Sequence, residues 1–502
     1  MINKVKAAVS GLVGSLSNKH SALPGPVAPP EKEPPRAVTA KPQPPCRPGF
    51  LKLSPEEFQK SGDHNGRTVL SPKTPGELQW GTGYAEVINA GKSQHNEDQA
   101  CCEFVVVEER DNKWNNNCSE LRTEESFNSD LQRSNKVSDM LCFYYWGLFD
   151  GHAGYGCALT SSRLLHLHIC DQLRDLVYIL QQPTVAAPLC LCNATAAENA
   201  SCTPTHEKTE PPLETTIRFH TEKQVFPESL VIGALENAFK QMDEQIEGER
   251  TSQNIEGGCC ALAAVCLMGK LFVANAGDSR AIIIRQGKTI SMSQEFTPET
   301  ERQRLQFLAT LKPELLGNEF TCLEFPRRIQ QKELGKRMLY RDHTMTGWSY
   351  KAIEEENMKF PLIYGEGKKA RVMATIGVTR GFGDHDLKVY NSNIYIKPFL
   401  SCVPGVKVYD LAGCEHGADD VMVMGTDGLW DVITDREVAD IVQRVFASHG
   451  TDHPNRYNLA AQELVLRTRG VRKESGWRLV NGKMASLDDI SVFVIPLIGY
   501  GS

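Results

Sequence analysis

Carboxylate side chains recur in this sequence beside apolar runs that are typical of buried strands. One Asp-Gly pair at such a place is an ordinary turn signal, but the same arrangement returns in several separate parts of the chain. The acids next to apolar runs are Glu97, Asp98, Asp150, Asp278, Asp427, Asp488 and Asp489. If these strand ends converge in the folded chain, the acids form one cluster.

A cluster of this kind would call for a bound cation. Mutual repulsion raises the pKa of neighbouring carboxyl groups unless a positive charge neutralises them. Carboxylates, water and a backbone carbonyl are ligands for the hard ions Mg²⁺ and Mn²⁺, whereas zinc would need His or Cys at ligand spacing, which the sequence lacks. Two such ions about 3.5–4 Å apart can share a carboxylate, activate a bridging water and hold a phosphoryl group for in-line attack.

The segment Asp150-Gly151-His152, directly after the apolar run 141–149, fits this chemistry. The missing side chain of Gly151 would let its backbone carbonyl approach an ion. His152 could protonate the leaving oxygen, although a histidine in a surface loop with no function would look the same. The segment therefore indicates a metal site that handles phosphoryl groups.

Composition narrows the classes of protein that remain. The chain has 62 acids against 55 Lys and Arg, for a net charge of −7, so it lacks the basic surface of a nucleic-acid binder. No apolar run is long enough for a transmembrane helix. The 16 cysteines include adjacent pairs inside apolar runs and no C-x-x-C. We interpret them as small buried hydrophobes in a reducing compartment, which favours the cytoplasm.

The chain before residue 49 divides into two parts. Apolar residues in segment 1–20 recur at steps of three and four, with Lys4 and Lys6 near the start and no acid. This pattern predicts weak contact with a membrane surface, with a mitochondrial presequence or an inert frayed terminus as alternatives. Residues 21–48 are proline-rich and predict an extended linker. Residues 49–502 are expected to form one catalytic domain.

Strands and helices are expected in blocks, which predicts an α+β fold of two sheets with flanking helices. Disordered insertions are expected near 110–138 and 183–220, and an irregular segment over 311–370. The expected strands are 83–91, 99–109, 141–150, a meander of three or four over 259–290, 421–426 and 490–497. The expected helices are 154–182, 228–250, one that starts at Pro298 after a Thr297 cap, 434–448 and 457–468.

Six ordered motifs give the sequence a family resemblance. The segments "NEDQ", "LFDGHAG", "VANAGDSRAII", "ATIGVTRGFGD", "GTDGLWDV" and "DDISVFVI" resemble the PPM family, the metal-dependent serine/threonine phosphatases of type 2C. The resemblance covers about residues 83–496, and the long insertions look like the H/J/M branch. It implies a four-layer α-β-β-α sandwich of two mainly antiparallel sheets, and hydrolysis of phosphoserine and phosphothreonine in phosphoprotein substrates.

The resemblance also implies a role for each matching residue. Asp150 bridges two core Mg²⁺ or Mn²⁺ ions, Gly151 lends its carbonyl, and Asp427 and Asp488 bind the first ion. Glu97 and Asp98 act around the pair through bound water. Asp278 and Asp431 match a third, weaker metal position, and His152 matches the general acid.

One departure concerns the phosphate. Many family members place an arginine five residues before the Asp of the E-D pair, and here that position is Ser93, preceded by Lys92. Lys92 can substitute as a point charge without the bidentate fork of Arg, and Arg380 is a second candidate for binding phosphate.

The segment 311–370 occupies the place of the family's flap. Its cations and aromatic residues predict contact with the substrate protein, although a solvated surface would also carry them: Arg327, Arg328, Lys332, Lys336, Arg337, Trp348 and Tyr350. The branch resemblance implies phosphorylated Rab-type small GTPases as substrates. An N-terminal membrane-surface segment would suit an enzyme that is peripheral on internal membranes.

Two alternatives come from other classes of protein. A catalytically inactive phosphatase-like scaffold would be expected to have lost metal acids, and this chain keeps all of them. A two-metal hydrolase acting on nucleic acid or nucleotides would be expected to carry a basic patch or a Gly-rich phosphate loop, which the sequence lacks.

Overall fold

The computed structural model describes residues 47–109, 140–182 and 223–498. The predictions for segment 1–20, for nearly all of linker 21–48 and for the insertions 110–138 and 183–220 concern residues outside these ranges. Within these ranges, no helix combines the length and the apolar composition that a membrane span requires.

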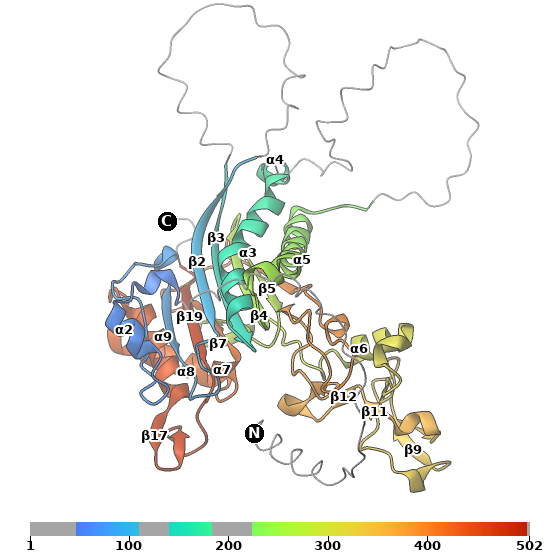
Figure 1. Cartoon of the computed structure of the whole chain (residues 1–502). Coiled ribbons are helices and arrows are strands. Elements are labelled where there is room, and N and C mark those ends of the chain that lie inside the picture. Colours follow the sequence, from blue (N-terminus) through green and yellow to red (C-terminus); the bar gives the residue numbers. More distant parts are fainter. Residues whose placement is uncertain (1–46, 110–139, 183–222, 499–502) are drawn as a thin grey trace, which may run out of the picture. The chain divides into compact units, whose positions relative to one another are not determined.

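Two antiparallel sheets form the centre of the fold (Figure 1). The first has the order β1-β19-β16-β6-β7, with bounds β1 Gly83–Val87, β19 Ile490–Pro496, β16 Val421–Gly425, β6 Arg280–Arg285 and β7 Lys288–Ser291. The second has the order β15-β5-β4-β3-β2, with bounds β15 Gly405–Asp410, β5 Lys270–Ala276, β4 Gly258–Leu267, β3 Leu141–His152 and β2 Gln99–Val107. The short strand β14 (Phe382–Gly383) also pairs with β4.

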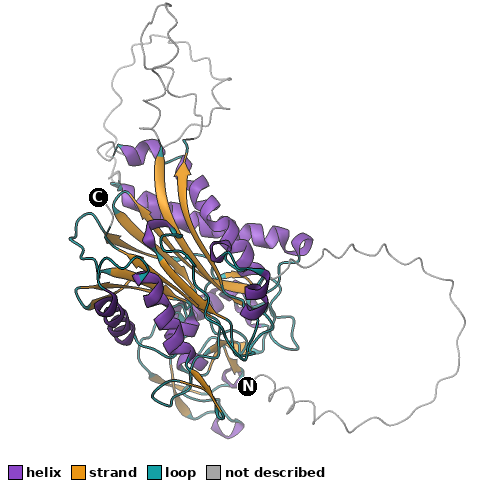
Figure 2. Cartoon of the chain, turned by 90° about the vertical axis from the view of Figure 1, so that its left-hand side faces the viewer, coloured by secondary structure: helices purple, strands orange, loops and turns teal. Residues whose placement is uncertain are grey.

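Helices cover the outer faces of both sheets (Figure 2). The α-helices are α2 Pro55–Ser61, α3 Gly156–Arg174, α4 Val177–Gln181, α5 Pro227–Gln253, α6 Arg302–Leu311, α7 Asp427–Trp430, α8 Asp435–His449 and α9 Arg456–Arg469. Helices α3 and α5 share one buried apolar cluster with the second sheet, and α8 and α9 share another with the first sheet. A third cluster lies between the two sheets. The predicted four-layer α+β sandwich is therefore confirmed.

Strand β4 shows how the sequence produces the layers. Side chains alternate between the two faces of a strand, so Cys259, Ala261 and Ala263 pack against the helices. Leu262, Ala264 and Cys266 point into the core between the sheets. Because both faces are buried, the strand is a continuous apolar run rather than an alternating one.

The expected meander over 259–290 is wrong. Strands β4 and β5 form a hairpin in the second sheet, but β6 and β7 form a hairpin in the first. The chain crosses between the sheets at residues 277–279. Hairpin turns are local signals, whereas the sheet that each hairpin joins depends on packing. This crossing carries Asp278 between the sheets.

Two helix boundaries also differ from expectation. The residues after Thr297 form a turn and α6 begins at Arg302, because the Thr300 hydroxyl donates to the backbone carbonyls of Glu295 and Thr297 and so competes with helix formation. The helix expected over 154–182 is divided into α3 and α4 at residues 175–176.

The segment expected to be irregular, 311–370, contains short paired strands and short 3-10 helices joined by loops. The strand pairs are β8 Phe320–Thr321 with β11 Phe360–Pro361, β9 Arg337–Tyr340 with β10 Ser349–Ala352, and β12 Ile363–Tyr364 with β13 Arg371–Val372. This segment and α6 share a separate apolar cluster that includes Leu305, Phe320 and Leu362. A further hairpin, β17 Val471–Lys473 with β18 Gly476–Arg478, precedes β19.

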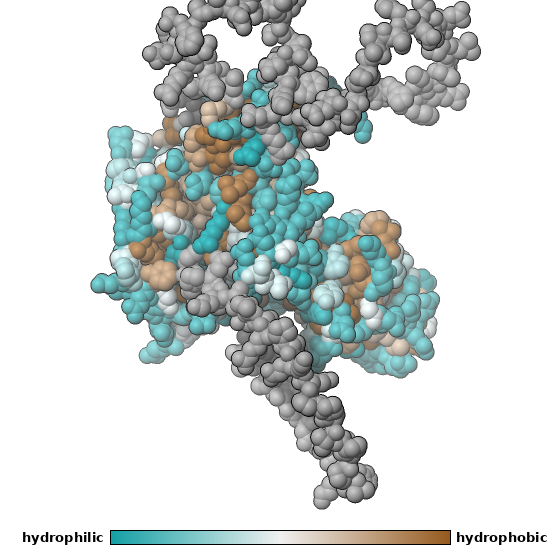
Figure 3. All heavy atoms as spheres, turned by 45° about the horizontal axis from the view of Figure 1, so that its top comes forward, coloured by the Kyte–Doolittle hydropathy of each residue, from teal (hydrophilic) through white to brown (hydrophobic). Residues whose placement is uncertain are grey.

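Most of the surface drawn in Figure 3 is hydrophilic, with apolar residues in patches. Exposed apolar side chains at β2 and just before β3 include Phe104, Val106 and Met140. Every cysteine in the described ranges is a free thiol, and most are buried.

Candidate active site

Three of the predicted acids meet where the two sheets face each other. One carboxylate oxygen each from Asp150, Asp278 and Asp427 lies within 4.8 Å of the others. Asp150 belongs to β3 of the second sheet, whereas Asp427 opens α7 directly after β16 of the first. The backbone N–H of Asp427 also donates to Asp150 Oδ2 at 3.3 Å. The site therefore depends on the packing of one sheet against the other.

The sequence had indicated that the strand ends at Asp150, but in the structure it does not. Strand β3 continues through His152, because Asp150, Gly151 and His152 pair with the first residues of β4. The pairing of β3 with the neighbouring strand β2 ends at Phe149, so beyond that point one edge of β3 lies beside residues 97–98. The acid thus projects from a strand whose backbone is held by β4.

Gly151 has a steric role that the sequence did not reveal. Its N–H donates to the carbonyl of Glu97 at 3.2 Å. A Cβ atom at position 151 would lie 2.5 Å from that same carbonyl oxygen. The glycine is therefore required for the close approach of the backbone that carries Glu97 and Asp98.

Burial and mutual repulsion destabilise the charged forms of these acids when no cation is bound. Burial, followed by the charges of neighbouring carboxylates, raises the pKa values of Asp150 and Asp427 well above the normal range. Burial also raises the pKa of Asp278. Acids in this state bind protons or cations readily at neutral pH.

Glu97 and Asp98 lie at the edge of this cluster. Asp98 is buried, and its Oδ2 accepts a hydrogen bond of 2.8 Å from the Thr426 hydroxyl. Its Oδ1 is also buried and has no hydrogen-bond partner among the described residues. Burial and the charge of Asp489 raise the pKa of Asp98 well above normal. Glu97 Oε1 accepts from the N–H of Gly154 at 2.6 Å.

Asp488 reaches the cluster with Lys92 as its partner. The Lys92 ammonium forms an ion pair with Asp488 Oδ2. Burial opposes the charge of Lys92, but Asp488, Asp427 and Asp150 together raise its pKa above normal. The structure thus brings Lys92 to the acids. The buried Arg67, which the sequence did not single out, holds this loop by donating to the Asp488 carbonyl at 2.7 Å.

Asp431 lies one helical turn beyond Asp427 and is half exposed. Its N–H donates to the Asp427 carbonyl at 2.8 Å, and its carboxylate pairs with Lys368 Nζ at 2.5 Å. The charge of Asp431 contributes to the raised pKa values of Asp278 and Asp427. The structure thus connects Asp431 both to the cluster and to a cation from the segment before β13.

His152 Nε2 lies 2.7 Å from Asp384 Oδ2. Burial opposes the charged imidazolium, but this hydrogen bond and nearby acids raise the pKa of His152 above its usual value. Sequence reasoning missed Asp384, although it closes the motif "TRGFGD". An acid that ends a glycine-rich motif after an apolar run was the available signal.

Arg380, the second candidate for phosphate, is occupied elsewhere. Its Nη2 and Nε donate to the carboxylate of Glu301 at 2.6 and 3.1 Å, and its Nη1 donates to the Val403 carbonyl. Its guanidinium also stacks over Phe296. None of these contacts involves an acid of the cluster, and phosphate binding by Arg380 stays a prediction.

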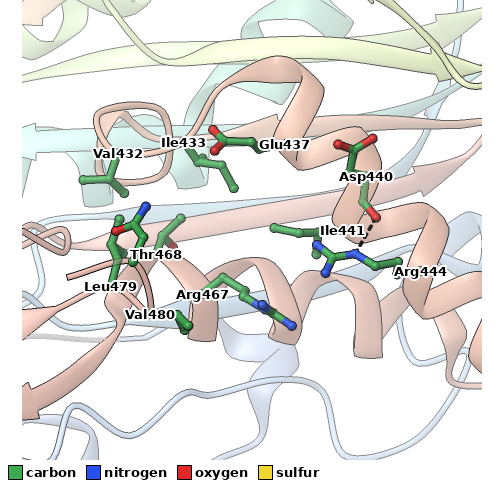
Figure 4. Close-up of a pocket in the computed structure, with 11 residues that line it drawn as sticks. Val432, Ile433, Glu437, Asp440, Ile441, Arg444, Arg467, Thr468, Leu479 and Val480 are labelled. Atoms are coloured by element: carbon green, nitrogen blue, oxygen red, sulfur yellow. Dashed lines mark hydrogen bonds between the residues drawn. The ribbon is translucent and has the colours of Figure 1, made fainter. Parts of the chain in front are cut away.

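A separate pocket of about 290 Å³ lies between α8, α9 and residues 479–481 (Figure 4). One of its lining residues, Val432, directly follows Asp431 in the chain. The other lining residues include the apolar Ile433 and Ile441 and the cationic Arg444 and Arg467. None of the predicted site residues lines it.

Comparisons with known proteins identify the family of this chain. The model of the family described as "Protein phosphatase 2C" matches residues 199–309 and 352–473. Protein phosphatase 1H of Mus musculus is 57% identical over 470 residues, covering 90% of this chain and 91% of that protein. The chain belongs to the protein phosphatase 2C family and is a metal-dependent protein serine/threonine phosphatase.

The branch is also shown. Protein phosphatase 1J of Homo sapiens is 55% identical over 525 residues, covering 100% of each chain. Protein phosphatase 1J of Mus musculus is 54% identical over 524 residues, covering 100% of this chain and 99% of that protein. These relatives place this chain in the H/J branch of the family.

Proposed function

We propose that the acid cluster holds two core divalent ions, Mg²⁺ or Mn²⁺, and a weaker third ion. The core ligands are Asp150, the Gly151 carbonyl, Asp427 and Asp488, with Glu97 and Asp98 acting through water. Asp278 and Asp431 serve the third position. The observation that carries the proposal is the convergence of the oxygens of Asp150, Asp278 and Asp427 within 4.8 Å.

The donor set fits hard cations. The cluster offers carboxylate oxygens, which Mg²⁺ and Mn²⁺ prefer. Their raised pKa values indicate that positive charge would stabilise them, and the buried Asp98 Oδ1 without a protein partner is suited to an ion or its water. One oxygen each from Asp150, Asp278 and Asp427 lies within 4.8 Å of the others, so the acid proposed for the third position belongs to the same cluster as the core acids.

Bound ions and protein side chains would have separate roles in the hydrolysis of the phosphate ester. When bound, the ions supply an activated water and positive charge beside the phosphoryl oxygens. The chain's acids fix where that charge lies, and Lys92 adds a cation that can contact the phosphate. His152, held by Asp384, donates a proton to the seryl or threonyl oxygen as it leaves.

A direct assay tests this function. The full chain is expected to release phosphate from phosphoserine and phosphothreonine peptides in Mg²⁺ or Mn²⁺, to stop when the ions are chelated, and to recover when they are restored. Retention of all acids argues against an inactive scaffold. That alternative would be supported if the folded chain bound Mn²⁺ or a phosphopeptide but released no phosphate under any metal condition.

Lys92→Ala is expected to raise KM for a phosphopeptide about tenfold, because a charge-assisted contact to phosphate contributes roughly 1.5 kcal/mol or more. Lys92→Arg should restore binding, since the guanidinium fork matches phosphate. Inhibition by inorganic phosphate should weaken in parallel. Lys73→Ala, which removes a surface partner of Glu57, is the control. An unchanged KM for Lys92→Ala would exclude this role.

Three finer expectations rest on the branch resemblance and on sequence pattern. Rab-type small GTPases are proposed as substrates, which a phosphorylated Rab included in the peptide assay would test. Weak membrane-surface contact is proposed for residues 1–20, and liposome flotation with and without them is the comparison. A cytoplasmic, partly membrane-peripheral location follows from these two and from the free cysteines.

A further inference from the structure

The carboxylate of Asp384 and the imidazole of His152 form a hydrogen-bonded pair in which the aspartate is buried and the histidine is partly exposed. The Asp384 side chain is only 5% exposed, whereas that of His152 is 33% exposed. His152 follows Asp150 by two residues on β3, so the two side chains lie on the same face of the strand. Asp384, 232 residues further along the chain, is the buried hydrogen-bond partner of the ring.

The turn that presents Asp384 is held firmly. Asp384 has φ of +56°, a left-handed conformation that non-glycine residues seldom adopt. Its N–H donates to the Gly257 carbonyl at 3.0 Å. The preceding Gly383 donates to the buried Asp243 at 2.9 Å, and Lys397 Nζ bridges Asp243 and the Gly383 carbonyl. A strained residue held by this many contacts is typical of a functional site.

Glycine at the start of β4 makes room for the pair. A Cβ atom at position 258 would lie 2.4 Å from Asp384 Oδ2 and 2.8 Å from His152 Nε2. At position 257, where φ is +72°, it would lie 2.1 Å from the His152 carbonyl oxygen. Residues 257 and 258 must therefore be glycine, because any side chain there would collide with His152 or Asp384.

We propose that Asp384 is a positioning residue for the general acid His152, an inference that rests on the function proposed above. Asp384 accepts the Nε2–H, which fixes the ring and leaves Nδ1 to carry the proton that is delivered. When the P–O bond to the seryl or threonyl oxygen breaks, its electron pair stays on that oxygen, which takes the Nδ1 proton. The alcohol leaves and His152 becomes neutral, with its Nε2–H still donated to Asp384.

The choice of substrate separates this role from a purely structural one. An alkoxide leaving group needs a proton, whereas the phenolate of p-nitrophenyl phosphate leaves with little help. Asp384→Asn is expected to lower kcat on a phosphothreonine peptide by about 100-fold, and kcat on p-nitrophenyl phosphate by clearly less. Asp420→Asn is the matched control, because Asp420 is equally buried but bonds to the backbone N–H groups of Gln286 and Gly417.

A double-mutant cycle gives a second readout. If Asp384 acts through His152, then Asp384→Asn should add no further loss on the phosphopeptide in a His152→Gln background. Equal losses on both substrates, or full additivity with His152→Gln, would overturn the proposal. Wild-type protein that is inactive on both substrates would instead contradict the proposed function, so the two failures are distinguishable.

A measurement on the unaltered protein covers the case in which Asp384→Asn does not fold. Nitrogen NMR of histidine-labelled, magnesium-loaded protein, with His152 assigned from the His152→Gln spectrum, reports which ring nitrogen carries the proton in the neutral form. Protonated Nε2 supports the proposal, and protonated Nδ1 overturns it.

Discussion

Asp150→Asn is expected to lower metal-dependent hydrolysis of a phosphothreonine peptide by about a thousandfold or more, and Asp427→Asn by a similar factor. Both carboxylates lie in the tight cluster, and they come from different sheets. Asparagine keeps the size of the side chain but removes a charge that the proposed ion site requires, and bound ions contribute several kcal/mol to transition-state stabilisation. Initial rates over a range of Mg²⁺ and Mn²⁺ concentrations measure the loss.

The same variants provide a readout that does not depend on activity. Burial and neighbouring acids raise the pKa of Asp150, so a neutral residue there relieves repulsion in the metal-free protein. The metal-free melting temperature of Asp150→Asn should therefore equal or exceed that of the wild type, while the rise on adding Mg²⁺ should be lost. Asp435→Asn, which removes a partner of Arg280 outside the cluster, should keep both properties. Full activity in a folded Asp150→Asn protein would remove this acid from the mechanism.

Metal removal should make the stability of the protein depend on pH in an unusual direction. Burial raises the pKa of Asp489 to about 7 and that of Asp98 well above normal, whereas unfolded aspartate titrates near about 3.9. The folded state therefore holds more protons than the unfolded state within this window. The stabilisation that these two acids contribute is complete below the unfolded pKa and is lost as pH rises through the folded pKa. The metal-free melting temperature should fall between about pH 5 and pH 8.

Saturating Mg²⁺ should remove most of this fall, because the ions take the place of the protons. Binding at a hundred times Kd contributes about 2.7 kcal/mol, which corresponds to a rise in melting temperature of about 3 °C for a domain of this size. Carboxylates with lowered pKa, such as Glu301 and Asp243, act only at lower pH and leave this window unaffected. A metal-free melting temperature that stayed constant or rose from pH 5 to pH 8 would contradict the account, and thermal melts in chelator measure it.

Short-range features of this protein could be predicted from the sequence alone. Apolar runs such as 421–425 predicted strands, because the backbone period and the need for burial are local properties. Asp150, Gly151 and His152 were recognisable as a candidate site because they are adjacent. Ordered motifs of this kind indicated the family and the four-layer sandwich.

The tertiary structure decided which distant groups meet. The sequence did not show that β4–β5 and β6–β7 join different sheets, that Asp384 pairs with His152, or that Arg380 is held by Glu301. These contacts join residues up to hundreds of positions apart. They depend on sheet pairing and on the packing of one layer against another, which act on the whole chain at once. Local residue type supplied the chemical groups, and only folding determined which of them share a site.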